Sequence, residues 1–71
     1  MRRIEWIGDV PERCQITRRP ITTAFVDGHI PGLSWAVMHP DEFKRYGGRF
    51  GLGMGQLYEK QADGHWLKVK G

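Results

Sequence analysis

The residues best suited to chemistry lie in two short stretches of the chain, CQIT and HPDE. Each begins with a good metal ligand, Cys14 or His39, and carries a second polar side chain three positions later, Thr17 or Glu42. Paired ligands at this spacing are typical of zinc knuckles, because structural zinc takes four nitrogen or sulfur ligands in tetrahedral geometry. Here the four positions offer a thiol, an imidazole, a carboxylate and a hydroxyl, and a hydroxyl is a poor zinc ligand.

Two interpretations of these positions follow. Zinc binding would require His29 or His65 as a further ligand, carried in by the tip of a hairpin. In a metal-free site, Cys14 would pack as a small apolar side chain, Thr17 would hydrogen-bond within its own turn, and His39 would precede a helix. We favour the metal-free interpretation, with no cofactor and four vestigial ligand positions.

Cys14 and His39 could also serve as a nucleophile and its base. Catalysis would further require an orienting group, oxyanion-stabilising donors and a pocket. A domain of 71 residues offers little concavity. Asp41 and Glu42 are adjacent in sequence, so they do not face each other across a cleft. We therefore predict that the protein is not an enzyme.

A short helix is predicted in HPDEFKRYG (39–47). Pro40 suits the first helical position, where its missing N–H is not needed. Acidic residues follow directly and basic residues come at the end, as the helix dipole favours. Gly47 can adopt the left-handed conformation that closes a helix.

Strand patterns flank this helix on both sides. The segment TTAFVDGHI (22–30) predicts a hairpin that turns at Asp27-Gly28, a pair that tolerates positive φ. Pro31-Gly32 marks a second turn or a bulge. The apolar run LSWAVM (33–38) is expected to be the most buried strand.

The C-terminal segment QLYEKQADGHWLKVK predicts a second hairpin, with a two-residue turn at Asp63-Gly64. This turn places Glu59 opposite Lys68, a favourable cross-strand pair. It also places Trp66 on the exposed face, beside Lys68 and away from the apolar residues. An exposed Trp beside lysines suits base stacking or a protein contact, and the alternative is a Trp that covers the glycine-rich strand.

Composition narrows the functional classes. Lys and Arg number 11 against 8 Asp and Glu, a net charge of +3, which is compatible with nucleic acid or an acidic protein partner. The single cysteine cannot form an intramolecular disulfide and indicates a reducing compartment. No apolar run reaches the length of a membrane span, and no signal peptide is recognisable. We expect a cytoplasmic protein that does not engage membranes.

We expect one domain over residues 1–71. Residues 1–13 form an N-terminal strand or extension, with a short strand at 3–7, and residues 14–71 form the main unit. The order of knuckle, hairpin, short helix and hairpin predicts a small α+β fold. It is that of a degenerate, metal-free treble clef or zinc ribbon.

The chain resembles a group of small bacteriophage-encoded proteins, mostly uncharacterised, of zinc-ribbon or treble-clef type. Their pattern has Cys-x-x-Cys before Pro-Ile, then Phe-Val-Asp-Gly, Trp-Ala-x-Met, a second Cys-x-x-Cys and a glycine-rich stretch. The matching residues here are Pro20-Ile21, Phe25-Val26-Asp27-Gly28, Trp35-Ala36, Met38, Gly51-Leu52-Gly53, Gly55-Gln56, Tyr58, Lys60, Asp63-Gly64 and Trp66. The resemblance covers 14–71 and implies the fold and a phage setting; three of the four cysteine positions are substituted.

The glycine-rich stretch GGRFGLGMGQ (47–56) with its basic flanks is the candidate binding site. Glycines let backbone N–H groups approach a phosphate, although this loop follows a helix and lacks the Gly-Lys-Ser/Thr ending of a nucleotide-binding loop. The alternative is a tight connection with no binding role. The predicted partner-binding residues are Arg18, Arg19, Lys44, Arg45, Arg49, Gly51, Gly53, Gly55, Trp66 and Lys68.

We expect a small non-enzymatic, phage-type accessory protein that binds nucleic acid or a nucleic-acid-handling protein. Two alternatives remain open: a phage-encoded modulator of a host protein, and a minor structural component of a virion. Self-association is left open in each case. If the chain is phage-encoded, its location is the host cytoplasm.

Overall fold

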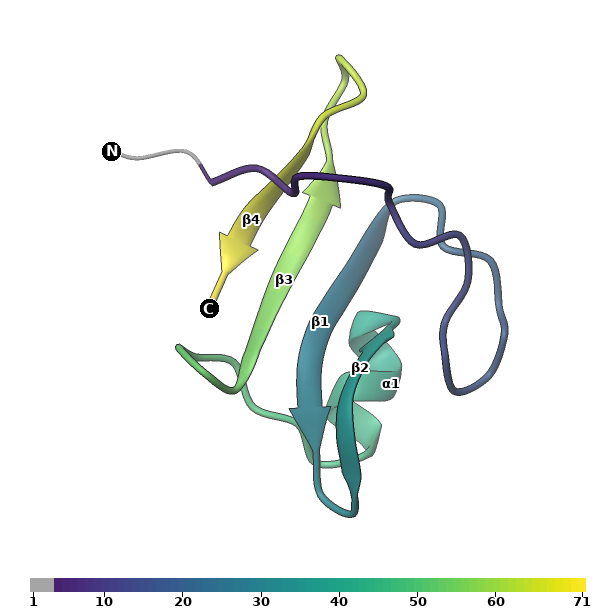
Figure 1. Cartoon of the computed structure of the whole chain (residues 1–71), viewed down its shortest axis with the longest axis vertical. Helices are drawn as coiled ribbons and strands as arrows, with labels where there is room; N and C mark the ends of the chain where they lie inside the picture. Colours follow the sequence, from purple (N-terminus) through teal and green to yellow (C-terminus); the bar gives the residue numbers. More distant parts are fainter. Residues whose placement is uncertain (1–3) are drawn as a thin grey trace.

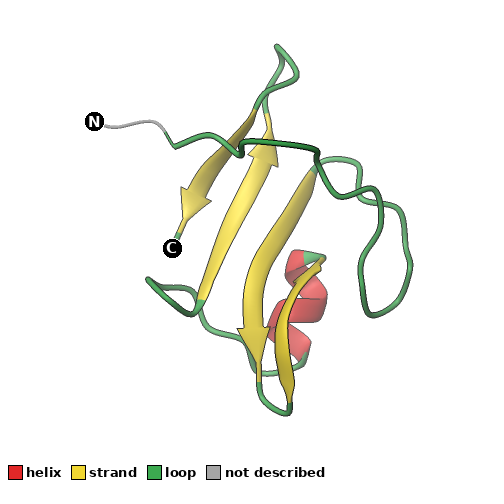
Figure 2. Ribbon diagram, viewed as in Figure 1, coloured by secondary structure: helices red, strands yellow, loops and turns green. Residues whose placement is uncertain are grey.

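The computed structural model describes residues 4–71. Its elements are β1 (Ala24–Ile30), β2 (Leu33–Met38), α1 (Pro40–Arg45), β3 (Gly55–Lys60) and β4 (Trp66–Lys70). The strands form one antiparallel sheet in the order β2-β1-β3-β4, as Figure 2 shows. The helix α1 lies on one face of this sheet, and the N-terminal segment crosses the other (Figure 1). The prediction of a small α+β domain with two hairpins and one short helix is confirmed.

The helix begins and ends where the sequence predicts. Pro40 occupies its start, acidic residues fill the first turn and basic residues the last. Gly47, just beyond the C-terminus, has a φ of 84°. These signals act within one or two turns of the chain, which is why they could be read without the tertiary structure.

The first hairpin turns at a different place from the predicted one. Asp27 pairs with Val37, and Gly28 with Ala36, so β1 runs straight through the expected turn. The chain reverses at Pro31-Gly32, between the paired residues Ile30 and Leu33. The prediction of a turn at Asp27-Gly28 was therefore wrong, and Pro31-Gly32, predicted as a second turn or a bulge, is the turn of this hairpin.

A close approach to Phe43 explains the glycine at position 28. A Cβ atom there would lie 2.7 Å from Cε1 of the Phe43 ring, which is fully buried. Gly48 and Gly55 contact the same ring and also leave no room for a Cβ. Three glycines thus leave the space that the Phe43 ring occupies. The packing of this ring on them holds α1 against β1.

The strand β2 lies at the edge of the sheet. Leu33 and Trp35 are 43% and 45% exposed, and of its residues only Ala36 and Met38 are buried. The strand expected to be most buried is therefore an edge strand, whereas β1 and β3 each lie between two partners. Apolar composition alone does not distinguish the two, because strand order depends on which strands pair.

The second hairpin has a register that differs by one residue from the predicted one. Glu59 pairs with Leu67, not with Lys68. The backbone N–H of Gln61 donates to the carbonyl of His65 at 2.7 Å, which leaves a three-residue loop in place of a two-residue turn. Because side chains alternate across a strand, a shift of one residue exchanges the two faces.

This shift turns Trp66 inward. Its side chain is 8% exposed and packs against Phe25 at a ring separation of 5.3 Å. Phe25 also stacks on Tyr58, and Trp6 from the N-terminal segment contacts both rings edge-on. The prediction of an exposed Trp66 was wrong, because the tryptophan belongs to an aromatic cluster under the N-terminal segment.

The N-terminal segment adds one bridge to the sheet. Glu5 pairs with Leu67, and the N–H of Trp6 donates to the carbonyl of Trp66 at 2.9 Å. Of the strand expected at 3–7, position 3 lies outside the described residues and the remainder is a single bridge. Within residues 4–71, no helix is long and apolar enough to cross a membrane.

Candidate functional site

The segment from Cys14 to Arg19 folds into a tight turn that presents a sulfur atom. The N–H of Arg18 donates to the carbonyl of Cys14 at 3.0 Å, and the N–H of Cys14 to the carbonyl of Arg19 at 2.9 Å. Arg18 has a φ of 68°, in the left-handed region. The N–H groups of Ile16 and Thr17 then point at Cys14 Sγ, at 3.3 and 3.4 Å.

The start of α1 supplies the other two groups of this site. His39 directly follows β2 and precedes the first helical residue. Glu42, three positions later, accepts a hydrogen bond from the backbone N–H of His39 at 3.1 Å, the carboxylate half of a capping box. Local helix capping therefore turns both side chains back toward the Cys14 turn.

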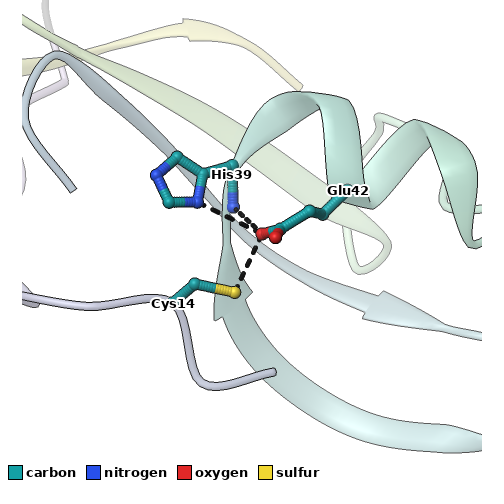
Figure 3. Close-up of side chains that lie close together, drawn as sticks. All are labelled: Cys14, His39 and Glu42. Carbon is teal, nitrogen blue, oxygen red and sulfur yellow. Dashed lines mark hydrogen bonds and ion pairs between the residues drawn. The ribbon is translucent and has the colours of Figure 1, made fainter. Parts of the chain in front are cut away.

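The three side chains converge on one point, as Figure 3 shows. Glu42 Oε1 lies 2.9 Å from Cys14 Sγ and 3.2 Å from His39 Nδ1. These three atoms all lie within 4.8 Å of one another. Cys14 is fully buried and Glu42 is 4% exposed. We call Cys14, His39 and Glu42 the Cys-His-Glu cluster.

The carboxyl group of Glu42 is held in its charged form. Burial acts to raise its pKa, but hydrogen bonds from Cys14, Thr17 and His39 outweigh burial and lower the pKa from 4.5 to about 2. Because a carboxylate only accepts hydrogen bonds, the thiol of Cys14 is the donor in their contact. All four knuckle positions recognised in the sequence thus meet at this carboxylate.

Arg19, one of the predicted partner-binding residues, forms ion pairs within the protein, although its side chain is 52% exposed. Its Nε lies 3.4 Å from Glu42 Oε2, and its guanidinium donates to the exposed carboxylate of Asp41 at 3.2 Å. The side chain therefore links the Cys14 turn to the first turn of α1. It contributes less positive charge to the surface than the sequence indicated.

The other predicted cations divide between different parts of the surface. Lys44, Arg45 and Arg49 are exposed around the end of α1, and no ion pair among the described residues engages them. Arg18 lines a separate recess near Val37. The predicted site is thus not one continuous surface.

A mainly apolar pocket of about 480 Å³ runs along α1, from Pro40 and Asp41 in its first turn to Gly48 beyond its end. Phe43, Phe50 and Leu57 form its apolar walls, and Lys44 lines it from α1. Lys70, which was not among the predicted binding residues, lines it from β4 and places its ammonium 5.1 Å from the centre of the Phe50 ring.

A bulge explains why Lys70 was missed. Lys68 pairs with Tyr58, while Lys70 pairs with Leu57, so β4 carries one extra residue between two consecutive residues of β3. The bulge directs Lys70 to the face of the sheet that holds α1, and leaves Lys68 on the face of the aromatic cluster. No local sequence signal marks this bulge.

The glycines of the predicted site serve packing and turn formation. Gly55 is buried under the Phe43 ring and opens β3. Gly51 and Gly53 lie in the turn before β3, and Gly53 adopts a φ of 74° that favours glycine. Together with the burial of Trp66, this removes Gly55 and Trp66 from the exposed surface.

Comparison of the chain with protein-family models, with curated proteins and with solved structures gave no significant match.

Proposed function

We propose that this protein is a small non-enzymatic accessory domain that binds nucleic acid through the surface around the end of α1. We call this surface the basic helix-end surface, and it comprises Lys44, Arg45, Arg49 and Lys70. The observation that carries the proposal is that Lys44 and Lys70, which form no ion pair among the described residues, line an apolar pocket with aromatic walls. Arg45 and Arg49 are exposed near the same end of the helix.

The chemistry of this surface fits a nucleic acid better than a purely acidic protein. Lysine and arginine side chains pair with phosphates and release counterions, so binding weakens with salt. The neighbouring pocket offers apolar walls and the Phe50 ring, against which an unpaired base can stack. We therefore expect single-stranded nucleic acid to bind more tightly than duplex.

The test is a titration of isotope-labelled protein with short single-stranded and duplex DNA, at low and moderate salt. Expected are salt-sensitive amide shifts at 44–50 and near Lys70. Replacing both Arg45 and Arg49 by Glu should abolish binding, whereas Lys60→Glu, at an exposed position of β3, should leave it within about twofold. Absence of shifts at low salt, or binding that survives the double charge reversal, would contradict the proposal.

A second candidate function is modulation of a host protein. Trp35 and Leu33 are both more than two-fifths exposed on the edge strand β2, and Trp35 Nε1 donates to Asp27 Oδ1. A partly exposed tryptophan is a common energetic centre of protein contacts. Binding to a protein that resists added salt and is lost in Trp35→Ala would favour this function, or a place in a virion, over nucleic-acid binding.

The proposal also includes a treble-clef-like arrangement of the fold and a location in the host cytoplasm. A knuckle joined to the start of a helix supports a treble-clef-like arrangement in which hydrogen bonds to Glu42 stand where metal bonds would. The resemblance to phage-encoded proteins supports the host cytoplasm as the location. Recovery of the protein with host nucleic acid from infected cells would test both setting and location.

A further inference from the structure

The hydrogen bonds of His39 define which atom of its ring faces the cluster. Nε2 lies 2.9 Å from the carbonyl oxygen of Pro20. A carbonyl only accepts, so Nε2 carries a hydrogen, and Nδ1 is the nitrogen directed at Glu42 Oε1, 3.2 Å away. An imidazole ligand of a metal ion characteristically donates its other N–H to such a carbonyl.

Three atoms that can each donate a lone pair therefore lie together: Cys14 Sγ and His39 Nδ1 both face Glu42 Oε1, and all three lie within 4.8 Å of one another. Such atoms repel one another unless a positive charge lies between them. In the metal-free protein, the thiol hydrogen of Cys14 lies between Sγ and Oε1. A metal ion would supply the positive charge more completely, since it can accept all three lone pairs at once.

The spacing of these atoms suits tetrahedral zinc. With bonds of about 2.0 Å to nitrogen and oxygen and 2.3 Å to sulfur, neighbouring ligand atoms lie roughly 3.3–3.5 Å apart. The observed Nδ1–Oε1 distance is 3.2 Å and the Sγ–Oε1 distance is 2.9 Å. The carboxylate would need to move away from the sulfur by about half an ångström. Sγ and Nδ1, which lie within 4.8 Å of each other, would need to approach to roughly 3.5 Å.

The surrounding groups already have the positions that support a bound metal. The N–H groups of Ile16 and Thr17 point at the sulfur and would stabilise a thiolate. Arg19 holds Glu42 Oε2, and the backbone N–H of His39 holds Oε1 in place beside the thiol and the imidazole. Because a thiolate and a carboxylate together carry two negative charges, a divalent ion would make the cluster neutral.

We propose that Cys14 Sγ, His39 Nδ1 and Glu42 Oε1 form a three-residue site for a thiophilic divalent metal ion, with zinc as the expected ion and water as its fourth ligand. Thiolate and imidazole ligands exclude magnesium and calcium, which require oxygen. On binding, the thiol of Cys14 releases its proton to solvent and coordinates the ion as a thiolate. This differs from the metal-free interpretation favoured on sequence, where zinc binding was expected to require His29 or His65 as a further ligand.

The test uses the full chain, stripped of metal and titrated with Co²⁺ and Zn²⁺. Bound Co²⁺ reports a thiolate ligand through sulfur-to-metal charge-transfer absorption in the near ultraviolet. We expect this band at one equivalent in the native protein and its loss in Cys14→Ser. Zn²⁺ should displace Co²⁺, and it should shift amides of 14–19 and 39–42.

Two histidine variants form a matched pair. His39→Gln should weaken Co²⁺ binding by about tenfold or more, because loss of a ligand should cost at least as much affinity as loss of a group that only supports a ligand. His29→Gln removes an exposed imidazole from β1, outside the cluster, and should leave affinity within about twofold. The amide spectrum of each variant establishes that it is folded.

The proposal is overturned if native protein shows no charge-transfer band with Co²⁺ in excess. It is also overturned if zinc shifts appear around His29 and His65 alone, or if His29→Gln weakens binding as much as His39→Gln. These readouts involve no nucleic acid, so they stand or fall independently of the proposed binding function. If Cys14→Ser fails to fold, the Co²⁺ titration of the native protein and the comparison of His39→Gln with His29→Gln still test the proposal.

Discussion

The thiol of Cys14 donates a hydrogen bond to the carboxylate of Glu42 across 28 residues of chain, at an Sγ–Oε1 distance of 2.9 Å. Both groups are buried, and the contact joins the N-terminal turn to the helix. Among the described residues, no buried side-chain nitrogen or oxygen lacks a hydrogen-bond partner. A polar cluster of this kind is stabilising only while all its members are paired.

Removing the Glu42 side chain should therefore destabilise the protein strongly. We expect Glu42→Ala to lower the free energy of unfolding by about 2–4 kcal/mol, because His39 and Cys14 lose their acceptor and Arg19 one of its ion pairs. Asp41→Ala, at an exposed neighbouring carboxylate, should cost less than about 1 kcal/mol. Urea unfolding in the presence of a chelator measures both, and equal effects would contradict the prediction.

Acid should weaken the protein through the same carboxylate. The pKa of Glu42 is about 2 in the folded protein, against 4.5 for the ordinary group. A lowered folded-state pKa means that its contribution, on the order of 3 kcal/mol, is present above pH 4.5 and is lost as the pH falls toward 2. Chelator-treated Glu42→Gln should lack this component between pH 4.5 and 2. An unchanged acid profile in that variant would assign the acid sensitivity to other carboxylates.

The packing of the Phe43 ring on Gly28 leaves no room for a side chain at that position. Gly28→Ala should cost about 1–3 kcal/mol, because the new Cβ would lie 2.7 Å from the ring. In a Phe43→Leu background the same change should cost clearly less, since the ring edge is absent. Thermal unfolding of the four proteins of this cycle gives the comparison, and strict additivity would show that the ring is not the obstacle.

The two tryptophans of the sheet should respond differently to truncation. Trp66→Ala should lower stability by about 3–5 kcal/mol, because the side chain is 8% exposed within the aromatic cluster. Trp35→Ala, at a 45% exposed position, should cost about 1 kcal/mol or less. Chemical unfolding followed by circular dichroism measures both. A mild Trp66→Ala would mean that the cluster contributes little to the fold.

The sequence by itself determined the parts of this protein that depend on neighbouring residues. The helix after His39 was readable because Pro40, the charge order and Gly47 act within two turns. The number of hairpins was readable from apolar runs and their separating glycines. The pairs Cys14/Thr17 and His39/Glu42 were also recognised from their spacing as parts of one site, and the structure brings the other three residues to the carboxylate of Glu42.

Only the tertiary structure decided the features that depend on distant partners. Gly28 looked like a turn residue, but it is glycine because Phe43 packs on β1 there. Trp66 changed faces because the hairpin loop has three residues, and Lys70 reached the pocket because β4 contains a bulge. A shift of one residue in register carries no local signal, since its energy comes from the packing of whole sheet faces.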